Sequence, residues 1–103
     1  MGKKNIKILT QAEIDKELRD LSDWEQKGDN IQKQFEFESF MDAINFIYNL
    51  APTFERIEHH ADIHILFNKI LFELQRFDVG GKITNRDIEV AHEIEKSFKE
   101  WRL

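Results

Sequence analysis

Cysteine is absent from the chain of 103 residues, which excludes disulfides, thiolate nucleophiles and thiolate metal ligands. A chain without disulfides is typical of a reducing compartment, so we predict a cytoplasmic protein. Apolar runs are short as well, because none approaches the ~20 residues that a membrane-spanning helix needs. Residues 1–5 lack the apolar stretch of a signal peptide. These absences predict a soluble protein with no membrane partner.

Basic residues are also in the minority. The chain has 15 Lys and Arg against 20 Asp and Glu, a net charge of −5, and only Lys3, Lys4 and Lys7 cluster. Neutralising phosphate groups supplies most of the affinity for nucleic acid, so we expect no direct binding to DNA or RNA.

Apolar residues, in contrast, are plentiful enough for one core. They make up 41% of the chain and include nine Phe, which is too many for a disordered protein. The length fits one domain and leaves no room for a second. We therefore predict a single domain over residues 1–103, in which residues 1–9 form a flexible N-terminal arm.

Three helices are predicted from their start signals. A Ser or Thr stands three positions before an acidic residue in each, which is the pattern of a capping box. The pairs are Thr10 with Glu13, Ser39 with Asp42, and Thr84 with Asp87. Apolar residues follow each pair at helical spacing. Pro52 lies within the second helix, where it predicts a kink or, alternatively, a break into two helices near Leu50.

Two hairpins are predicted between the helices. Ile31, Phe35 and Phe37 alternate with polar residues after a turn at residues 28–30, and we pair them with the Trp24 segment. Residues 63–67 and 70–77 form the second hairpin, with Asn68-Lys69 as its turn. This register places six apolar residues on one face. Its pairs are Phe67 with Ile70, Ile65 with Phe72, Ile63 with Leu74, His64 with Glu73, Asp62 with Gln75, and His60 with Phe77.

The predicted fold is therefore α+β, with the order α-β-β-α-β-β-α. A four-stranded antiparallel sheet carries the three helices on one face. The last helix has an apolar seam, formed by Ile88, Ala91, Ile94, Phe98 and Trp101. We predict a homo-oligomer, a dimer or tetramer, that associates through this seam or through a strand edge. The alternative is that the seam packs on the protomer's own sheet.

Histidines are the strongest candidates for chemistry. No G-x-S-x-G nucleophile motif occurs, and Gly80-Gly81 is best read as a turn. His60 and His64 would share one face of a helix, but on a strand they lie ~13 Å apart, so we predict no metal site. His64 is expected to pair with Glu73, and His92 to be solvated.

His59-His60 differs from the other histidines because carboxylates surround it. Glu55, Glu58 and Asp62 lie close in sequence, where a helix is expected to end. We expect solvent to reach both imidazoles at this polar helix end. Imidazoles beside carboxylates can transfer protons near neutral pH. The alternative is an ordinary helix C-terminus, where His is favoured by the helix dipole.

These residues resemble the signature of the pterin-4a-carbinolamine dehydratase family. The signature residues are Glu55-x-x-x-His59-His60, Phe67 and Asp87, and further matches are Trp24, residues 33–37, Phe40, Asn68-Lys69 and residues 84–88. The resemblance runs from about Thr10 to Trp101. It implies dehydration of 4a-hydroxytetrahydropterin to quinonoid dihydropterin in tetrahydropterin recycling. It implies acid–base catalysis with no metal or organic cofactor.

The resemblance also implies roles for individual residues. His59 would be an acid/base and His60 would bind or polarise the pterin, while Glu55 and Asp87 would orient ring groups or the histidines. The remaining substrate-binding residues would be Glu58, Gln75, Arg76 and Phe77.

Two positions depart from the family pattern. Ala61 stands where Pro or another small residue is usual, and Phe77 stands where the family has a third His or sometimes Trp. A general acid or base contributes roughly 10²–10⁴-fold, so we expect Phe77 to reduce activity. The alternative function is a catalytically weak member that acts as a protein-interaction or dimerisation module.

Overall fold

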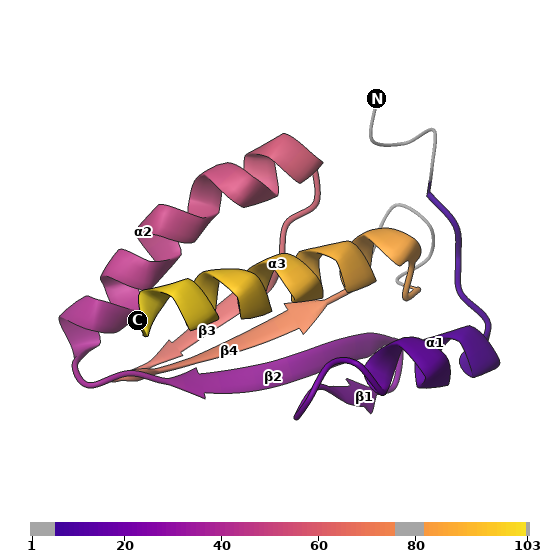
Figure 1. Cartoon of the computed structure of the whole chain (residues 1–103), viewed down its shortest axis with the longest axis horizontal. Coiled ribbons are helices and arrows are strands. Elements are labelled where there is room, and N and C mark those ends of the chain that lie inside the picture. Colours follow the sequence, from indigo (N-terminus) through magenta and orange to yellow (C-terminus); the bar gives the residue numbers. More distant parts are fainter. Residues whose placement is uncertain (1–5, 76–81, 103) are drawn as a thin grey trace.

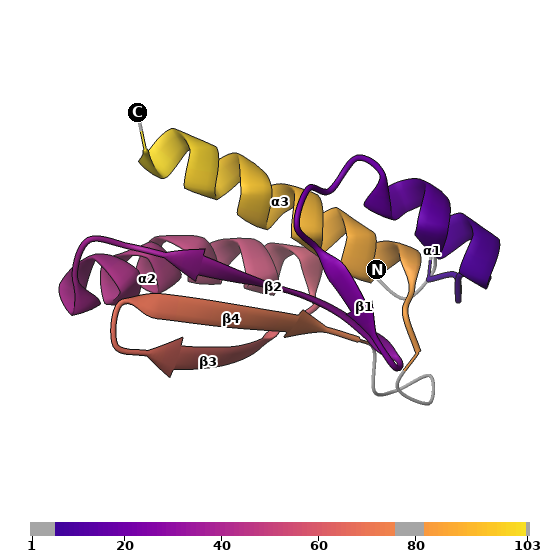
Figure 2. The same ribbon diagram turned by 90° about the horizontal axis from the view of Figure 1, so that it is seen from below.

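The computed structural model describes residues 6–75 and 82–102. Its elements are α1 (Gln11–Leu18), β1 (Glu25–Lys27), β2 (Asn30–Glu36), α2 (Phe40–Ile57), β3 (Asp62–Leu66), β4 (Lys69–Leu74) and α3 (Asn85–Trp101). The strands form one antiparallel sheet in the order β1-β2-β4-β3 (Figure 1). The three helices lie on the same side of that sheet (Figure 2). The predicted α+β fold and element order are confirmed.

The helices begin where the capping residues predict. The boxes at Thr10 and at Thr84 are complete, with bonds in both directions between the cap and the acidic residue. At Ser39 the hydroxyl accepts a hydrogen bond from the backbone N–H of Asp42, which is half of the expected box. The second helix runs unbroken through Pro52, so the alternative of two helices is wrong.

Apolar side chains fill the space between the sheet and the helices. Four aromatic rings pack edge-on or tilted in this space. The ring of Phe98 contacts those of Phe35, Phe37 and Phe46, and Phe37 also contacts Phe46, with ring centroids 4.8–5.9 Å apart. The seam of α3 belongs to this core. Its Ile88, Ala91 and Ile94 are buried, and Phe98 and Trp101 pack against them. The seam therefore packs within the protomer, and it does not form an exposed surface for a partner helix.

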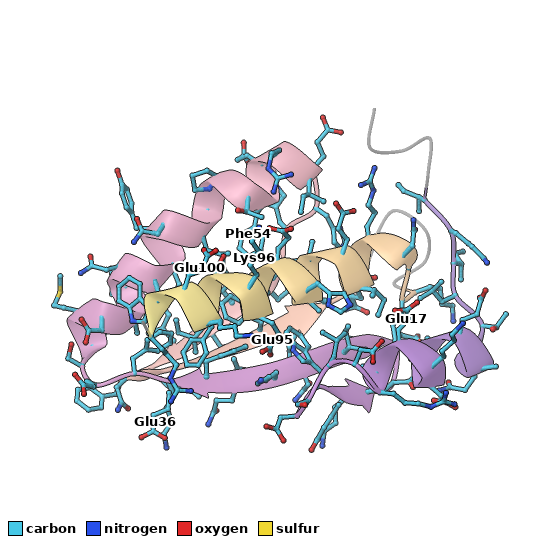
Figure 3. The ribbon with its side chains drawn as sticks, viewed as in Figure 1. Glu17, Glu36, Phe54, Glu95, Lys96 and Glu100 are labelled. Carbon is cyan, nitrogen blue, oxygen red and sulfur yellow. The ribbon has the colours of Figure 1, made fainter. Side chains whose placement is uncertain are left out.

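A polar cluster joins α3 to the sheet. The Nε1 of Trp24 donates to Oε2 of Glu95 at 2.8 Å, and the Nζ of Lys33 lies 2.5 Å from the same oxygen. Figure 3 shows Glu95 on the side of α3 that is turned toward β2. This cluster fixes α3 across the sheet.

The hairpin of β3 and β4 turns one residue earlier than predicted. Ile63 lies opposite Phe72 and Ile65 opposite Ile70, so the turn residues are Phe67 and Asn68. The end of β2 explains the difference, because Asn68 makes two hydrogen bonds to Phe37. Its backbone O accepts from the N–H of Phe37 and its Nδ2 donates to the Phe37 carbonyl, both at 2.8 Å. Phe67 consequently takes the first turn position with a left-handed φ of 60°.

The shift changes which residues face each other, but the side chains that stay paired keep their predicted faces, and only Phe67 moves from the apolar face into the turn. Asp62 lies opposite Glu73, where Gln75 was predicted, and His64 lies opposite Leu71. The His64 ring still reaches Glu73 diagonally, with Nε2 3.1 Å from Oε1. The predicted pairing of His60 with Phe77 followed from the wrong register, and Phe77 lies outside the described residues.

Part of the segment expected to be a flexible arm is paired. Ile8 forms a β-bridge with Thr84, and hydrogen bonds flank it on both sides. Residues 1–5 lie outside the described residues. No helix in residues 6–75 or 82–102 is long and apolar enough to cross a bilayer.

Candidate functional site

The site lies where α2 ends, at Glu58. This residue has a left-handed backbone (φ 61°), which ends the helix. Its N–H donates to the Glu55 carbonyl and the N–H of His59 donates to the Phe54 carbonyl, both at 3.2 Å. This pair of bonds is a Schellman motif, in which Gly is the usual left-handed residue. A side chain there costs about 1–2 kcal/mol, so the backbone at the start of the histidine pair is strained.

His59 points into the protein. Its side chain is 5% exposed, and its Nε2 bonds to Oδ1 of Asp87, whose side chain is fully buried. Figure 1 shows that α2 ends and α3 begins toward the same end of the sheet, which brings the two residues together. The prediction that both imidazoles are solvent-reachable is therefore wrong for His59. The left-handed turn at Glu58 and the bond to Asp87 are the physical reasons.

Asp87 is itself held in place by the start of α3. Its Oδ2 accepts from the backbone N–H of Thr84 at 2.7 Å, and the Thr84 hydroxyl lies 3.3 Å away. One carboxyl oxygen thus caps the helix while the other holds the imidazole of His59. Sequence reasoning identified Thr84 only as a cap. The T-x-x-D pattern was the available signal, but it could not reveal that the capping carboxyl also contacts a histidine.

His60 lies on the surface, as predicted. Its side chain is 62% exposed, and its Nε2 lies 3.1 Å from Oε2 of Glu55, which is 75% exposed. Its ring also contacts Phe54, with centroids 6.4 Å apart. Phe54 lies on the side of α2 that is turned toward α3 (Figure 3). Each of the two adjacent histidines therefore pairs with a carboxyl group. The pair of His59 with Asp87 is buried, and the pair of His60 with Glu55 is exposed.

The structure describes two of the four other predicted site residues. Glu58 is exposed at the C-cap of α2, and Gln75 is half-buried just after β4. Arg76 and Phe77 lie outside the described residues. His92 is exposed on α3, as expected.

The arrangement is suited to moving protons. An imidazole next to a carboxyl group can accept a proton in one step and donate it in another. Within the described ranges, no three His, Asp or Glu side chains are grouped so that they could hold a metal ion.

Known proteins resemble this chain over most of its length. Residues 7–97 match the model of the family described as pterin 4 alpha carbinolamine dehydratase. A protein of Sulfurisphaera tokodaii is 38% identical over 91 residues, covering 88% of this chain and 97% of its own length. One of Roseiflexus sp. is 39% identical over 88 residues, covering 85% and 94%. Both carry the name "Putative pterin-4-alpha-carbinolamine dehydratase".

A solved structure is similar as well. The crystal structure of a transcriptional coactivator/pterin dehydratase from Brucella melitensis superposes with a TM-score of 0.82 at 25% identity. The match covers 88% of this chain and 98% of the Brucella chain. The agreement of the family match, the relatives and the fold shows that the chain belongs to the pterin 4 alpha carbinolamine dehydratase family.

Proposed function

We propose that the protein dehydrates 4a-hydroxytetrahydropterin to quinonoid dihydropterin in cytoplasmic tetrahydropterin recycling. The observation that carries this proposal is the pair of imidazole–carboxyl contacts at the end of α2, His59 with Asp87 and His60 with Glu55. Family membership supports the reaction class. The cytoplasmic location is proposed from the absence of cysteine.

The proposed reaction needs two proton transfers and no nucleophile. One group protonates the C4a hydroxyl, which leaves as water when the C–O bond breaks. Another group accepts the proton of N5, and the electrons of that N–H bond form the new C4a=N5 double bond. Two imidazoles next to each other in the chain can divide these tasks.

We assign the contact with the substrate mainly to His60. Its ring is exposed, and Glu55 lies close enough to take up or return a proton. His59 has only a small exposed edge, so the pterin must lie against the end of α2 to reach it. Asp87 holds the ring of His59 in one orientation, as an acid/base requires. Glu58, Gln75, Arg76 and Phe77 are proposed as further pterin contacts, in line with the resemblance.

The test compares two exposed histidines. His60→Ala should lower kcat by about 10²-fold or more, because it removes a general acid or base. His64→Ala is the matched control, since His64 is 50% exposed and also lies 3.1 Å from a glutamate. The control should keep wild-type kinetics. Equal activity of both variants would overturn the assignment of His60.

A second function, as a protein-interaction or dimerisation module, is favoured by exposed apolar side chains. Met41 is 58%, Tyr48 79%, Leu66 54% and Phe67 73% exposed. The similar protein from Brucella is also described as a transcriptional coactivator. If this is the main function, wild-type protein will not accelerate dehydration over the spontaneous rate.

We also propose self-association through the free part of β2. β1 pairs only with residues 30–32, and a groove of about 760 Å³ follows the next residues of β2. Phe35 in β2 and Phe37 just after it contribute to its wall, as do Phe98 and Trp101 of α3. A strand edge of this kind is suited to pairing with another strand. Light scattering at tens of micromolar should give a dimer or tetramer, and a strict monomer would rule this out.

A further inference from the structure

Residues 7–9 are bonded to the start of α3 on both sides of Thr84. The N–H of Leu9 donates to the Ile83 carbonyl at 3.0 Å, and the N–H of Asn85 donates to the Lys7 carbonyl at 3.0 Å. In addition, the N–H of Lys7 donates to Oδ1 of Asn85 at 2.7 Å. We call these three hydrogen bonds the N-terminal clamp. Because they flank Thr84, they restrict the backbone that caps α3.

Thr84 lies between Ile83 and Asn85, the two residues that the clamp bonds, and it holds Asp87. Thr84 donates its N–H to Oδ2 of Asp87 at 2.7 Å, and its carbonyl accepts the N–H of Asp87 at 3.1 Å. The other oxygen of Asp87 bonds to His59. Lys7 is therefore connected to the imidazole of His59 in three steps. Hydrogen bonds join Lys7 to Asn85, the peptide bond joins Asn85 to Thr84, and hydrogen bonds lead from Thr84 through Asp87 to His59.

The clamp is anchored at its other side by α1. The Nζ of Lys7 lies 2.6 Å from Oε2 of Glu13, and Oε1 of Glu13 accepts the N–H of Thr10 at 2.8 Å. These bonds, the one from Lys7 first, lower the pKa of Glu13 from 4.5 to about 2. The segment thus joins the capping boxes of two helices. The bond from the N–H of Thr10 to Glu13 does not need the side chain of Lys7.

We infer that Asn85 is a positioning residue, which keeps His59 in its reactive orientation by fixing residues 7–9 to the N-terminus of α3. The inference rests on the proposed function of His59 as an acid/base. Asn85 itself is at the first position of α3 and does not contact the histidine pair in any bond described above. In this inference, the effect of Asn85 on the reaction passes through Thr84 and Asp87.

The experiment uses three variants of the whole chain. Asn85→Ala removes the side-chain acceptor at a helix position where Ala is well tolerated. Asn85→Asp keeps an oxygen acceptor in the same place, and a negative charge is favourable at a helix N-terminus. Lys7→Ala is the matched control, because it removes the exposed ion pair with Glu13 and keeps the backbone hydrogen bonds of the clamp.

Two readouts are measured for each variant. The first is the pair of kinetic constants for dehydration, with kcat and KM determined separately. The second is the solvent-exchange rate of the His59 ring proton that bonds to Asp87, followed by NMR, which needs no activity. Asn85→Ala should lower kcat about tenfold at unchanged KM, because small displacements of a catalytic group reduce rates strongly. It should also speed the exchange about tenfold, while Asn85→Asp and Lys7→Ala stay within about twofold of wild type.

The outcomes separate this inference from the proposed function. Unchanged exchange in Asn85→Ala overturns the inference, whether or not the protein is a dehydratase. If exchange is faster in Asn85→Ala but the wild type shows no dehydratase activity, the clamp is supported and the proposed function is overturned. Loss of kcat in Asn85→Ala that Asn85→Asp does not restore also contradicts the inference. If Asn85→Ala does not fold, Lys7→Pro removes the same hydrogen bond from its donor side and is measured in the same way.

Discussion

Replacing His59 by Ala should destabilise the protein far more than replacing His60. The Ala variant of His59 removes a buried partner from Asp87, whose side chain has no exposed surface. Breaking a buried pair in this way costs about 3–5 kcal/mol, because the remaining group is left without its hydrogen bond. The total stability of a small domain is about 5–15 kcal/mol, so much of it would be lost. His60 and Glu55 are mostly exposed, and such a pair contributes at most about 1 kcal/mol.

The assay is urea unfolding followed by tryptophan fluorescence, since Trp24 is buried and Trp101 is half-buried. His64→Ala serves as the control for losing an exposed histidine that has a glutamate partner. The midpoint should fall strongly for His59→Ala and little for the other two variants. Similar midpoints for all three would refute the burial of the His59–Asp87 pair. The same data decide which variants can be used in kinetics, because activity lost through unfolding says nothing about chemistry.

Glu58→Gly should raise the free energy of unfolding by about 0.5–1 kcal/mol, since Gly adopts the left-handed conformation without strain but loses more entropy on folding; an unchanged or lower melting temperature would contradict this. The carboxyl group of Glu13 should titrate near pH 2 by NMR in the wild type, and its pKa should rise toward 4.5 in Lys7→Ala. Because that pKa is lowered in the folded state, the contribution of Glu13 is fully present above pH 4.5 and is lost as the pH falls toward 2. Phe77→His, which restores the histidine of the family pattern, should raise kcat by about tenfold or more. A higher KM with an unchanged kcat would instead identify Phe77 as a wall that stacks on the pterin.

The element order could be predicted because its signals are local. Each helix start was marked by a Ser or Thr and an acidic residue three positions later, and bonds within four residues realise those signals. The alternation of Ile31, Phe35 and Phe37 identified a strand that is buried on one face. Such patterns lie within a single helix or strand, so they do not depend on contacts with distant parts of the chain.

The hairpin register could not be predicted in the same way. Asn68-Lys69 was a reasonable turn by composition, yet Asn68 is bonded to Phe37, which is 31 residues away. That contact requires a bulky Phe67 to adopt a left-handed backbone, which local preferences disfavour. A long-range interaction thus decided the turn. The predicted pairing of His60 with Phe77 rested on the register that this interaction overturned.

The sequence correctly predicted that the histidine pair follows the end of α2. It did not predict that one histidine would be buried and the other exposed. Two facts decide this difference: the left-handed conformation of Glu58, and a carboxyl group 28 residues further along the chain. The family resemblance identified Asp87 as a site residue without indicating which histidine it holds. The double role of Asp87, as helix cap and histidine partner, follows only from the three-dimensional arrangement.

The central claim is tested most directly by the rate at which 4a-hydroxytetrahydropterin loses water, with and without the protein. Formation of quinonoid dihydropterin is followed by absorbance, and spontaneous decay in buffer gives the baseline. The wild type should accelerate the reaction in proportion to its concentration, and His60→Ala should lose about 10²-fold or more of that acceleration. A wild-type rate equal to the spontaneous rate would contradict the claim that this histidine pair is a dehydratase site.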